Sequence, residues 1–470
     1  MFKGRVPMCG EYAAKDMGGV SSYSHRYLRI GLISPYVGTN LGDAAIIESA
    51  RTHLIRLFPK AEFLLIVLDC EYVSNLHGLE AFPLAAIPLP FYNTVVYVQR
   101  AGLSGQTKPR TSGVESLRLH ARSELKKIAG RIPLLLSAAR RLRDGLVMVS
   151  LEIPHLLQAR KVVNSLDGLI IAGGGQFDDE YGGPWGHPYS MFKWITLANS
   201  AHVPVFFVGV GVDDLHHSLS KWFLRHILAR ARRVSLRDAG SNGILRRVGI
   251  QRELIACPDL AFGMPCMNDA APLPPVPASS KFTIGLSPIS FGLKDRWPTI
   301  HSAIFERYWV ELKEFAASLL RANHSLKIFV TDGGDEELAK MLYDHLAGAG
   351  ADGEHVQLFP LLRLQDHITL LRSCDAVVAS RLHGVLLSHA GGVPVLAISY
   401  RRKVRVHMED MGQEQFCLDF ETFTSSEARD SLFSMLADRS GIVSALLQRC
   451  TEKCMAIDQE FSAIGAEMAI

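Results

Sequence analysis

Short apolar runs alternate along this chain with longer segments in which apolar residues recur at helical spacing. The first apolar run covers residues 28–34, an amphipathic segment covers 43–58, and a second apolar run covers 62–68. A strand, a helix and a strand in this order are typical of a βαβ unit, in which the two strands are parallel. Further strands of the same kind are expected at 168–172, 204–208, 233–236 and 253–256.

A proline-rich stretch at 264–280 interrupts the alternation. It holds five prolines among small residues, which is typical of a linker between domains. The alternation then restarts, with strands expected at 282–287, 326–331, 355–359, 374–378 and 393–399. Two successive Rossmann-like halves predict an α/β fold of the GT-B kind, in which two parallel sheets face a central cleft.

The domain plan that follows has two Rossmann-like domains with extensions. We expect the end of the chain to be helical and to pack back across both domains. The predicted boundaries are an N-terminal tail at 1–26, an N-terminal domain at 27–263, the linker at 264–280, a C-terminal domain at 281–424 and a helical segment at 425–470.

The alternation fails between about 71 and 164, which indicates a basic helical insertion in the N-terminal domain. Residues 100–144 carry eleven Lys or Arg against three Asp or Glu, and leucines mix with arginines at 131–141. A basic amphipathic helix of this kind can lie on an anionic membrane surface. A helical excursion with a solvated basic face is the other interpretation, and we favour it as the commoner case.

Size and composition limit the class of protein. A chain of 470 residues is too long for one core, and 48% apolar with 21% charged residues is usual for a globular protein. The net charge of +3 gives no reason to expect nucleic acid as a partner. The eight cysteines form no CxxC pair, so reduced thiols are expected and a zinc site is not.

The sequence predicts no targeting or membrane-spanning segment. Residues 1–25 contain scattered charges and no apolar stretch of the kind found in signal peptides. Residues 81–99 are uncharged, but Pro83, Pro88 and Pro90 favour loops and an edge strand over a spanning helix. We therefore expect a cytoplasmic protein.

Ser380–Gly384 is the stretch with the clearest chemistry. It follows an apolar run and precedes a helical segment, so Arg381 and His383 lie where a strand ends and a helix begins. In open α/β sheets that edge binds ligands, and the free N–H groups of a helix start suit an anion. Arg381 adds a permanent charge and His383 exchanges a proton near neutral pH, which together indicate phosphate or carboxylate chemistry.

Other candidate residues follow the remaining strands. Glycines let backbone N–H groups approach a ligand closely, and clustered cations indicate an anion site. Helix capping would account for Asn40 or Asp43, and a solvated turn for any single member of the basic cluster, equally well. The three glycines at 173–175 exceed what a tight turn needs, so we favour a functional role for them. The candidate ligand-binding residues are Asn40, Gly42, Asp43, Gly173, Gly174, Gly175, Gln176, Asp178, Gly211, Ser380, Tyr400 and Lys403, beside Arg237, Arg381 and His383.

The order and spacing of these motifs resemble the polysaccharide pyruvyl transferases. The resemblance rests on Asn40–Asp43, Gly173–Gly175, Gly209–Gly211, Arg237–Asp238, Asp259–Phe262, Ser380–Gly384 and Tyr400 with Lys403. It implies transfer of pyruvate from phosphoenolpyruvate onto a sugar as a ketal, with Arg237, Arg381 and His383 binding the donor. Arg401, where the family often has an acidic residue, and the long basic insertion are departures that leave the acceptor open.

Ketal formation needs a proton on the methylene carbon of the donor, so that an oxocarbenium-like centre forms for a sugar hydroxyl to attack. His383 is the best candidate acid, because its pKa lies near neutral and nearby anions would raise it. Binding the phosphate alone is an equally good role for it. Asp178 and Asp332 are candidate bases or sugar ligands, and no metal or cofactor is expected.

Two other functions remain compatible with the sequence. One is a GT-B glycosyltransferase that uses a nucleotide sugar, and the other is a non-catalytic glycan-pathway protein of the same fold. The acceptor of a pyruvyl transferase would be a sugar or a lipid-linked glycan, which the basic insertion would bring to the cytoplasmic membrane face. Self-association into a homo-oligomer stays open.

Overall fold

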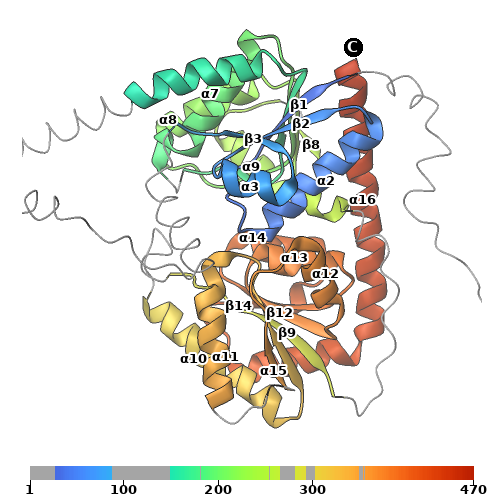
Figure 1. The fold of residues 1–470 in the computed structure, drawn as a ribbon. Coiled ribbons are helices and arrows are strands. Elements are labelled where there is room, and N and C mark those ends of the chain that lie inside the picture. The colour runs from blue at the N-terminus through green and yellow to red at the C-terminus, as the bar shows by residue number, and fades with distance from the viewer. Residues whose placement is uncertain are drawn as a thin grey trace, which may run out of the picture.

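The computed structural model describes residues 27–86, 149–179, 182–252, 254–264, 281–292, 302–348, 353 and 355–469. These residues form two α/β domains, one above the other in Figure 1, with a long helix running along one side of both. Each domain is built on a parallel sheet. The predicted α/β fold with two parallel sheets is therefore confirmed.

The N-terminal sheet has the strand order β3-β2-β1-β4-β6-β7-β8, and its neighbouring strands are parallel. Strand β4 is buried along its whole length, which explains its continuously apolar sequence. The short strand β5 pairs with the end of β6. The bounds are β1 (Arg29–Ile33), β2 (Glu62–Val67), β3 (Glu80–Pro83), β4 (Gly168–Ala172), β5 (Gly175–Phe177), β6 (Val205–Val212), β7 (Arg233–Leu236) and β8 (Ile255–Ala256).

Helices cover both faces of this sheet. Because side chains alternate along a strand, Ile30 and Leu32 of β1 join one buried cluster with residues of α2, whereas Ile33 joins a second cluster with residues of α7 and α8. The helical elements are α2 (Leu41–Leu57), α3 (Cys70–His77), a helix at 149–163, η2 (Gly183–Trp185), α7 (His187–Ser200), α8 (Ser218–Leu228), α9 (Ala239–Arg247) and η3 (Leu260–Gly263).

The C-terminal sheet has the order β11-β10-β9-β12-β13-β14, again with parallel neighbours. Its strands are β9 (Thr283–Ser287), β10 (Ser325–Ile328), β11 (Val356–Leu358), β12 (Ala376–Ala379), β13 (Val395–Ser399) and β14 (Cys417–Asp419). Its helical elements are α10 (Ser302–Arg321), η5 (Gly333–Asp335), α11 (Glu336–Gly348), α12 (Leu364–Arg372), α13 (Leu382–Ala390), α14 (Arg402–Asp410), η6 (Glu414–Phe416) and α15 (Ser425–Ala437).

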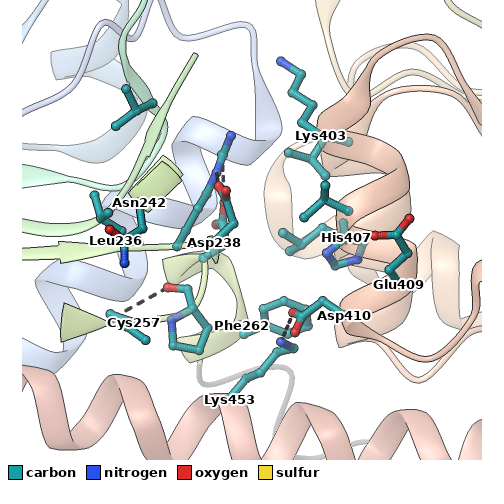
Figure 2. A pocket seen from close by; sticks show the side chains of 18 of the residues that line it. Leu236, Asp238, Asn242, Cys257, Phe262, Lys403, His407, Glu409, Asp410 and Lys453 are labelled. Carbon is teal, nitrogen blue, oxygen red and sulfur yellow. Dashed lines mark hydrogen bonds and ion pairs between the residues drawn. The ribbon is translucent and has the colours of Figure 1, made fainter. Parts of the chain in front are cut away.

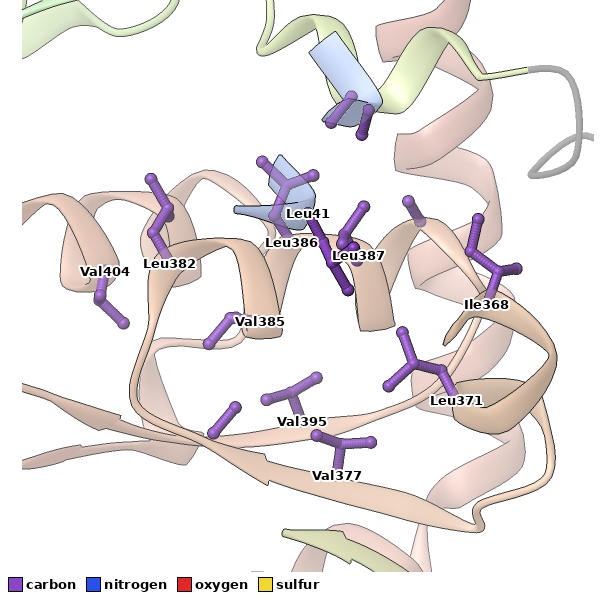
Figure 3. Close-up of a cluster of buried hydrophobic side chains, with 14 of the residues drawn as sticks. Leu41, Ile368, Leu371, Val377, Leu382, Val385, Leu386, Leu387, Val395 and Val404 are labelled. Carbon is purple, nitrogen blue, oxygen red and sulfur yellow. The ribbon is translucent and has the colours of Figure 1, made fainter. Parts of the chain in front are cut away.

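The core of the C-terminal domain continues into the N-terminal domain. Val385 of α13 lies above the paired residues Val377 and Val395 of the sheet (Figure 3). On the opposite side of α13, Leu41 at the start of α2 lies beside Leu386, and all five side chains are buried in one cluster. The two domains therefore meet through apolar packing as well as through polar contacts.

The last helix, α16 (Arg439–Ala469), binds both domains, as we expected for the helical segment at 425–470 (Figure 1). At its start, the guanidinium of Arg439 lies 3.3 Å from the carboxylate of Asp375, just before β12. Towards its end, Glu460 accepts two hydrogen bonds from Arg233 of β7, at 3.0 and 2.9 Å. The helix therefore fixes how the two domains lie relative to each other.

The strand–helix alternation extends further than we predicted. Helix α3 and strand β3 lie inside the region assigned to the insertion, and β3 is the edge strand that Pro83 indicated. The strand predicted at 204–208 covers only half of β6, which continues through Gly209–Val212. The pairing of β6 with β7 shifts its register in this region. Strand β14 was not predicted, because it has only three residues.

Several expectations concern residues outside the described part of the chain. These are the tail at 1–26, the basic stretch at 100–144 and the linker residues 265–280. Within the described ranges, no helix is both long enough and apolar enough to cross a bilayer.

Candidate functional site

A cavity of about 570 Å³ lies between the two domains. The end of β7, the start of α9 and η3 form one wall, α14 forms the other, and Lys453 of α16 lies at its base (Figure 2). Arg237 and Lys403 contribute to opposite walls. The predicted meeting of the two domains at the carboxyl ends of their strands is therefore present.

Arg237 is held in place by two carboxylates and a glycine. Its guanidinium lies 3.3 Å from the carboxylate of Asp259 and 3.6 Å from that of Asp238. It packs so closely on Gly211 of β6 that a Cβ at this position would lie 2.6 Å from Nε of Arg237. Gly211 therefore belongs to the site because it makes room for Arg237.

His383 reaches the N-terminal domain from the first turn of α13. Its ring lies against Gly42 in α2, where a Cβ would come within 1.9 Å of the ring atoms Cγ and Nδ1. Its Nε2 is buried and has no hydrogen-bond partner among the described residues. Because no protein group within the described ranges satisfies this nitrogen, it is a candidate to contact a ligand.

The pKa of His383 is lowered to about 4, chiefly by burial; Asp259 raises it, and Arg237, Lys403 and Arg381 lower it. We expected nearby anions to raise this pKa, which is wrong for the ligand-free molecule. Desolvation is the largest effect, and it penalises the imidazolium more than Asp259 favours it. His383 is therefore neutral at neutral pH until an anion binds.

Arg381 faces two carboxylates of its own domain. Its Nε donates to Asp335, and its Nη1 lies 3.7 Å from Asp332. Asp335 is almost fully buried and also accepts hydrogen bonds from the backbone N–H and hydroxyl of Ser290. Burial opposes the charge of Arg381, but these carboxylates outweigh it and hold the pKa of Arg381 above its usual value. Arg381 is therefore fixed at the start of α13, where Leu382 lines the cavity, whereas Arg381 and His383 are not part of its wall.

Asn40 joins the two domains. Its Oδ1 caps α2 by accepting from the N–H groups of Gly42 and Asp43, at 2.9 and 3.3 Å. Its Nδ2 donates to Asp332 at 3.1 Å, and backbone hydrogen bonds between the same two loops flank this contact. The capping role considered for Asn40 is thus present, and Asp332 serves as a domain contact.

Two helices of the C-terminal domain start at the cavity without a capping side chain. The N-cap residues are Arg381 for α13 and Arg401 for α14, and neither makes a side-chain cap hydrogen bond. Leu382, Arg402 and Lys403, from the first turns, line the cavity. The positive ends of both helix dipoles therefore add to the cations here.

The basic residues that follow β13, Arg401, Arg402 and Lys403, make different contacts. Lys403 lines the cavity and has no ion-pair partner among the described residues. Arg402 reaches across to Gly240 of α9, where a Cβ would lie 2.7 Å from its Nη2. Tyr400 instead packs on Phe291, with ring centroids 5.0 Å apart, and Arg401 lies over the Phe291 ring. Ser380 is buried.

The glycine-rich loop after β4 has a structural role. Gly173 and Gly174 have φ values of 46° and 71°, a region that favours glycine. Gly173 packs on Ile46 of α2, and the carbonyl of Gly174 accepts from the N–H of Gly211 at 2.8 Å. Gly173–Gly175 and Asp178 are not part of the cavity wall. The side chain of Gln176 lies outside the described part.

Asp43 is partly buried on the first turn of α2. Burial, Asp332 and Asp259 raise its pKa to about 7, although Lys403 and Arg237 oppose this effect. These charges come from both domains, so Asp43 lies near the junction between them, although it is not part of the cavity wall.

Sequence reasoning did not identify Asp335, the partner of Arg381, and it included Arg402 only as one cation of the basic cluster after the strand at 393–399. It placed Asp259 in a motif without a role, but Asp259 is the partner of Arg237. Asp335 is the last residue of η5, well beyond the end of β10 at Ile328, so its position gave no clear signal in the sequence. No group of three potential metal ligands occurs within the described ranges.

Comparison with solved structures shows the fold. A glycosyltransferase from Rickettsia africae superposes with a TM-score of 0.52 at 12% identity, covering 95% of this chain and 99% of that one. A protein described as a UDP-N-acetylglucosamine 2-epimerase from Listeria monocytogenes gives 0.52 at 10% identity, covering 94% and 97%. The chain therefore has the two-domain GT-B-like fold.

Sequence comparison identifies the family. No curated protein matches the chain. The family model for polysaccharide pyruvyl transferase matches residues 40–402, which include the capped start of α2, both arginines and His383. The chain belongs to the polysaccharide pyruvyl transferase family.

Proposed function

We propose that this protein transfers pyruvate from phosphoenolpyruvate onto a sugar, as a ketal that bridges two hydroxyl groups, and releases phosphate. The observation that carries the proposal is the pair of cations Arg237 and Lys403 on opposite walls of an interdomain cavity, close to the start of α13 that carries His383, in a chain of this family. Cations from both domains face one small space there. A small donor with a phosphate and a carboxylate suits such a space.

The charges support a compact anion as donor. Arg237 has a planar guanidinium that can bind phosphate or carboxylate with two hydrogen bonds, and Lys403 adds a mobile charge without a competing partner within the described residues. Arg381 is held at the start of α13, so its positive charge lies at the same edge of the C-terminal sheet as Lys403. In our proposal the two anionic groups of phosphoenolpyruvate lie between Arg237, Lys403 and the open starts of α13 and α14.

The reaction needs proton transfers that balance. A proton adds to the methylene carbon, a sugar hydroxyl adds to the adjacent carbon and gives up its proton, and phosphate leaves with the electrons of the broken C–O bond. A second hydroxyl then closes the ketal and gives up its proton. Of the two protons released by the sugar, one replaces the proton given to carbon and one leaves with the phosphate.

The rest of the cavity supports a sugar as acceptor. Beyond Arg237 the walls carry Asn242, Asp213 and Glu409 with apolar side chains between them. Carboxylate and amide groups can bind hydroxyl groups, and apolar side chains can contact the carbon face of a sugar ring. A sugar bound there would place its hydroxyls next to a donor held by Arg237.

A nucleotide-sugar glycosyltransferase is the second candidate, because the Rickettsia africae glycosyltransferase shares the fold. The two are separated by incubating the full chain with phosphoenolpyruvate and a panel of glycans, followed by assays of phosphate and of glycan mass. A gain of one pyruvyl ketal per glycan supports our proposal. Binding of nucleoside diphosphates, with no binding of phosphoenolpyruvate by calorimetry, contradicts it.

We also propose that the protein docks on an anionic membrane when its acceptor is lipid-linked. The helix at 149–163 supports this, because Val149, Ile153 and Leu157 share one face and are 55%, 54% and 62% exposed. Exposed apolar side chains next to basic ones favour binding at a lipid surface. The neighbouring basic stretch at 100–144 would add electrostatic attraction.

The membrane proposal is tested with vesicles that contain phosphatidylglycerol. Replacing Val149, Ile153 and Leu157 together by Ser should weaken binding, and so should deletion of 100–144. Val310→Ser is the control, because Val310 is 59% exposed on α10 of the other domain. Unchanged binding after both alterations contradicts membrane docking.

A further inference from the structure

The carboxyl groups near the cavity differ in their hydrogen-bond and ion-pair partners. Asp259 pairs with Arg237 and accepts from the N–H of Ala261 at 3.1 Å. Asp238 caps α9 by accepting from the N–H of Ser241 at 2.7 Å. Both of these groups are engaged as hydrogen-bond acceptors of their own domain.

The two carboxyl groups on the other side of the interface are engaged as well. Asp332 accepts from Asn40 and from the N–H of Gly334 at 2.8 Å. Asp335 accepts from Arg381 and Ser290. All four of these carboxyl groups therefore have structural partners within the protein.

Asp43 differs from these four groups. Within the described part of the chain, its carboxyl group has no hydrogen-bond or ion-pair partner. Helix α2 does not need it as a cap, because Asn40 fills that role. A partly buried carboxyl group that nothing holds, at the junction of two domains, is positioned for a ligand.

The surroundings of Asp43 favour a proton on it. Asp332 from the loop after β10 and Asp259 before η3 face it and disfavour its charge, and burial acts in the same direction. Lys403 of α14 and Arg237 after β7 oppose them and are outweighed, so the pKa of Asp43 is raised to about 7. At neutral pH a large fraction of Asp43 is protonated.

His383 has the opposite tendency, although it lies against Gly42, the residue before Asp43. Its pKa is lowered to about 4, so it is an uncharged proton acceptor at neutral pH. Two neighbouring groups with pKa values moved apart in this way form an acid and a base.

We propose that Asp43 is the catalytic acid that delivers the proton to the methylene carbon of phosphoenolpyruvate, and that His383 accepts the proton of the attacking hydroxyl. This inference rests on the proposed pyruvyl transfer. The Asp43 O–H bond breaks, a C–H bond forms, and the carboxylate left behind faces the positive charge that develops on the adjacent carbon. Asp43 recovers its proton from His383 or from solvent after the second hydroxyl has reacted.

The assignment also agrees with where the charges of the donor would lie. Phosphate and carboxylate are drawn to Arg237, Lys403 and the starts of α13 and α14, which leaves the uncharged methylene end of the donor for the remaining side. A neutral carboxylic acid on α2 meets that end without electrostatic repulsion.

The test uses the full chain with Asp43→Asn, which keeps the shape of the side chain and cannot donate an acidic proton. Phosphoenolpyruvate binding is measured by calorimetry, and turnover by phosphate release in the presence of an acceptor. We expect binding that is as tight as in the wild type or tighter, because a negative group near the donor is lost. Turnover should fall at least about 100-fold, the usual effect of removing a general acid.

Reactions in deuterium oxide and at several pH values give a readout that a structural role would not affect. Deuterium should enter the methyl group of the ketal with the wild type, and its rate of entry should fall with turnover in Asp43→Asn. The wild-type turnover should decrease as pH rises through the pKa of Asp43, and Asp43→Asn should lose that dependence. Asp43→Glu should restore part of the activity.

Glu48→Gln is the matched control, since it is the same kind of change on the same helix, at a carboxylate that pairs with His77 and Arg51 instead. Its kcat should stay within about twofold of the wild-type value. If Asp43→Asn folds and keeps wild-type turnover, or if it loses donor binding, Asp43 is not the acid. If the wild type neither binds phosphoenolpyruvate nor pyruvylates any glycan, the proposed function itself fails.

Discussion

His383 of the C-terminal domain and Gly42 of the N-terminal domain are in direct contact, so closely that a Cβ on residue 42 would lie 1.9 Å from the imidazole ring. A glycine that was expected to approach a ligand instead accommodates a side chain from the other domain. Glycines make room for a side chain at two more positions: Gly211 for Arg237 of the same domain, and Gly240 for Arg402 of the other domain. The site can therefore be altered by adding a methyl group, without removal of a functional group.

Gly42→Ala should displace His383 while leaving the imidazole in the chain. We expect kcat/KM to fall by about 100-fold, the loss that follows a shift of about 1 Å in a catalytic group. Steady-state kinetics at a fixed acceptor concentration measure it. Gly243→Ala on α9 is the control, because a Cβ there meets only Arg247, at 3.9 Å. Equal activity of the two variants would show that His383 does not need its present position.

Gly211→Ala should affect donor binding more than the chemical step. A Cβ at position 211 would lie 2.6 Å from the Arg237 guanidinium, so that side chain must move away from the cavity. We expect KM for phosphoenolpyruvate to rise about tenfold, since one charge-assisted contact is weakened. A matching loss of affinity in Arg237→Lys would support the same cause, whereas an unchanged KM in both variants would contradict a donor contact by Arg237.

Asn40→Ala should weaken both α2 and the contact between the domains. Loss of an N-cap costs about 0.5–2 kcal/mol, and the bond to Asp332 is lost as well. Chemical denaturation should show lower stability, and KM should rise because α2 carries Gly42 and Asp43. Thr424 caps α15, because its side chain accepts a hydrogen bond from the backbone N–H of Glu427. Thr424→Ala removes this cap, so it should lower stability without changing KM. A KM effect of equal size in both variants would mean that general loosening is the cause.

Asp43 should make the protein less stable as pH rises. Its pKa is raised from an ordinary value near 3.8 to about 7 in the folded state, so folding favours the protonated form. The stabilising contribution is complete below pH 3.8 and is lost as pH increases through 7. Asp43→Asn should therefore raise the free energy of unfolding by about 1 kcal/mol at pH 8, with partial exposure limiting the gain, and leave it unchanged near pH 4. A stability difference with the opposite dependence on pH would contradict a buried, protonated Asp43.

The sequence predicted the sheets well where strands are buried on both sides. Gly168–Ala172 and Arg233–Leu236 were located to the residue, because a short apolar run bounded by charged or polar residues is typical of a buried strand. The strands that were missed or shortened include β14 and β5, which are short, and the end of β6, where glycines hide the strand. Strand β3 was indicated only as an edge, through Pro83.

The cations of the site could be predicted from the sequence, but the carboxylates that pair with them could not. Arg237, Arg381 and His383 follow strands, and the carboxyl ends of parallel strands meet at one edge. Which carboxylate holds each arginine depends on how two loops of different strands pack, as Asp335 with Arg381 shows. The three glycines that begin at Gly173 fitted both a ligand loop and a tight turn in the sequence, and the contact with Ile46 favours the structural role.

Helix α16 has a consequence for the way in which ligands enter and leave. A hinge rotation that opens the cleft would have to pull this helix from Asp375 at one end or from Arg233 at the other, and would also break the contact between Asn40 and Asp332. These contacts therefore make wide opening costly in the ligand-free molecule. We therefore expect substrate and product to enter and leave without wide separation of the two domains.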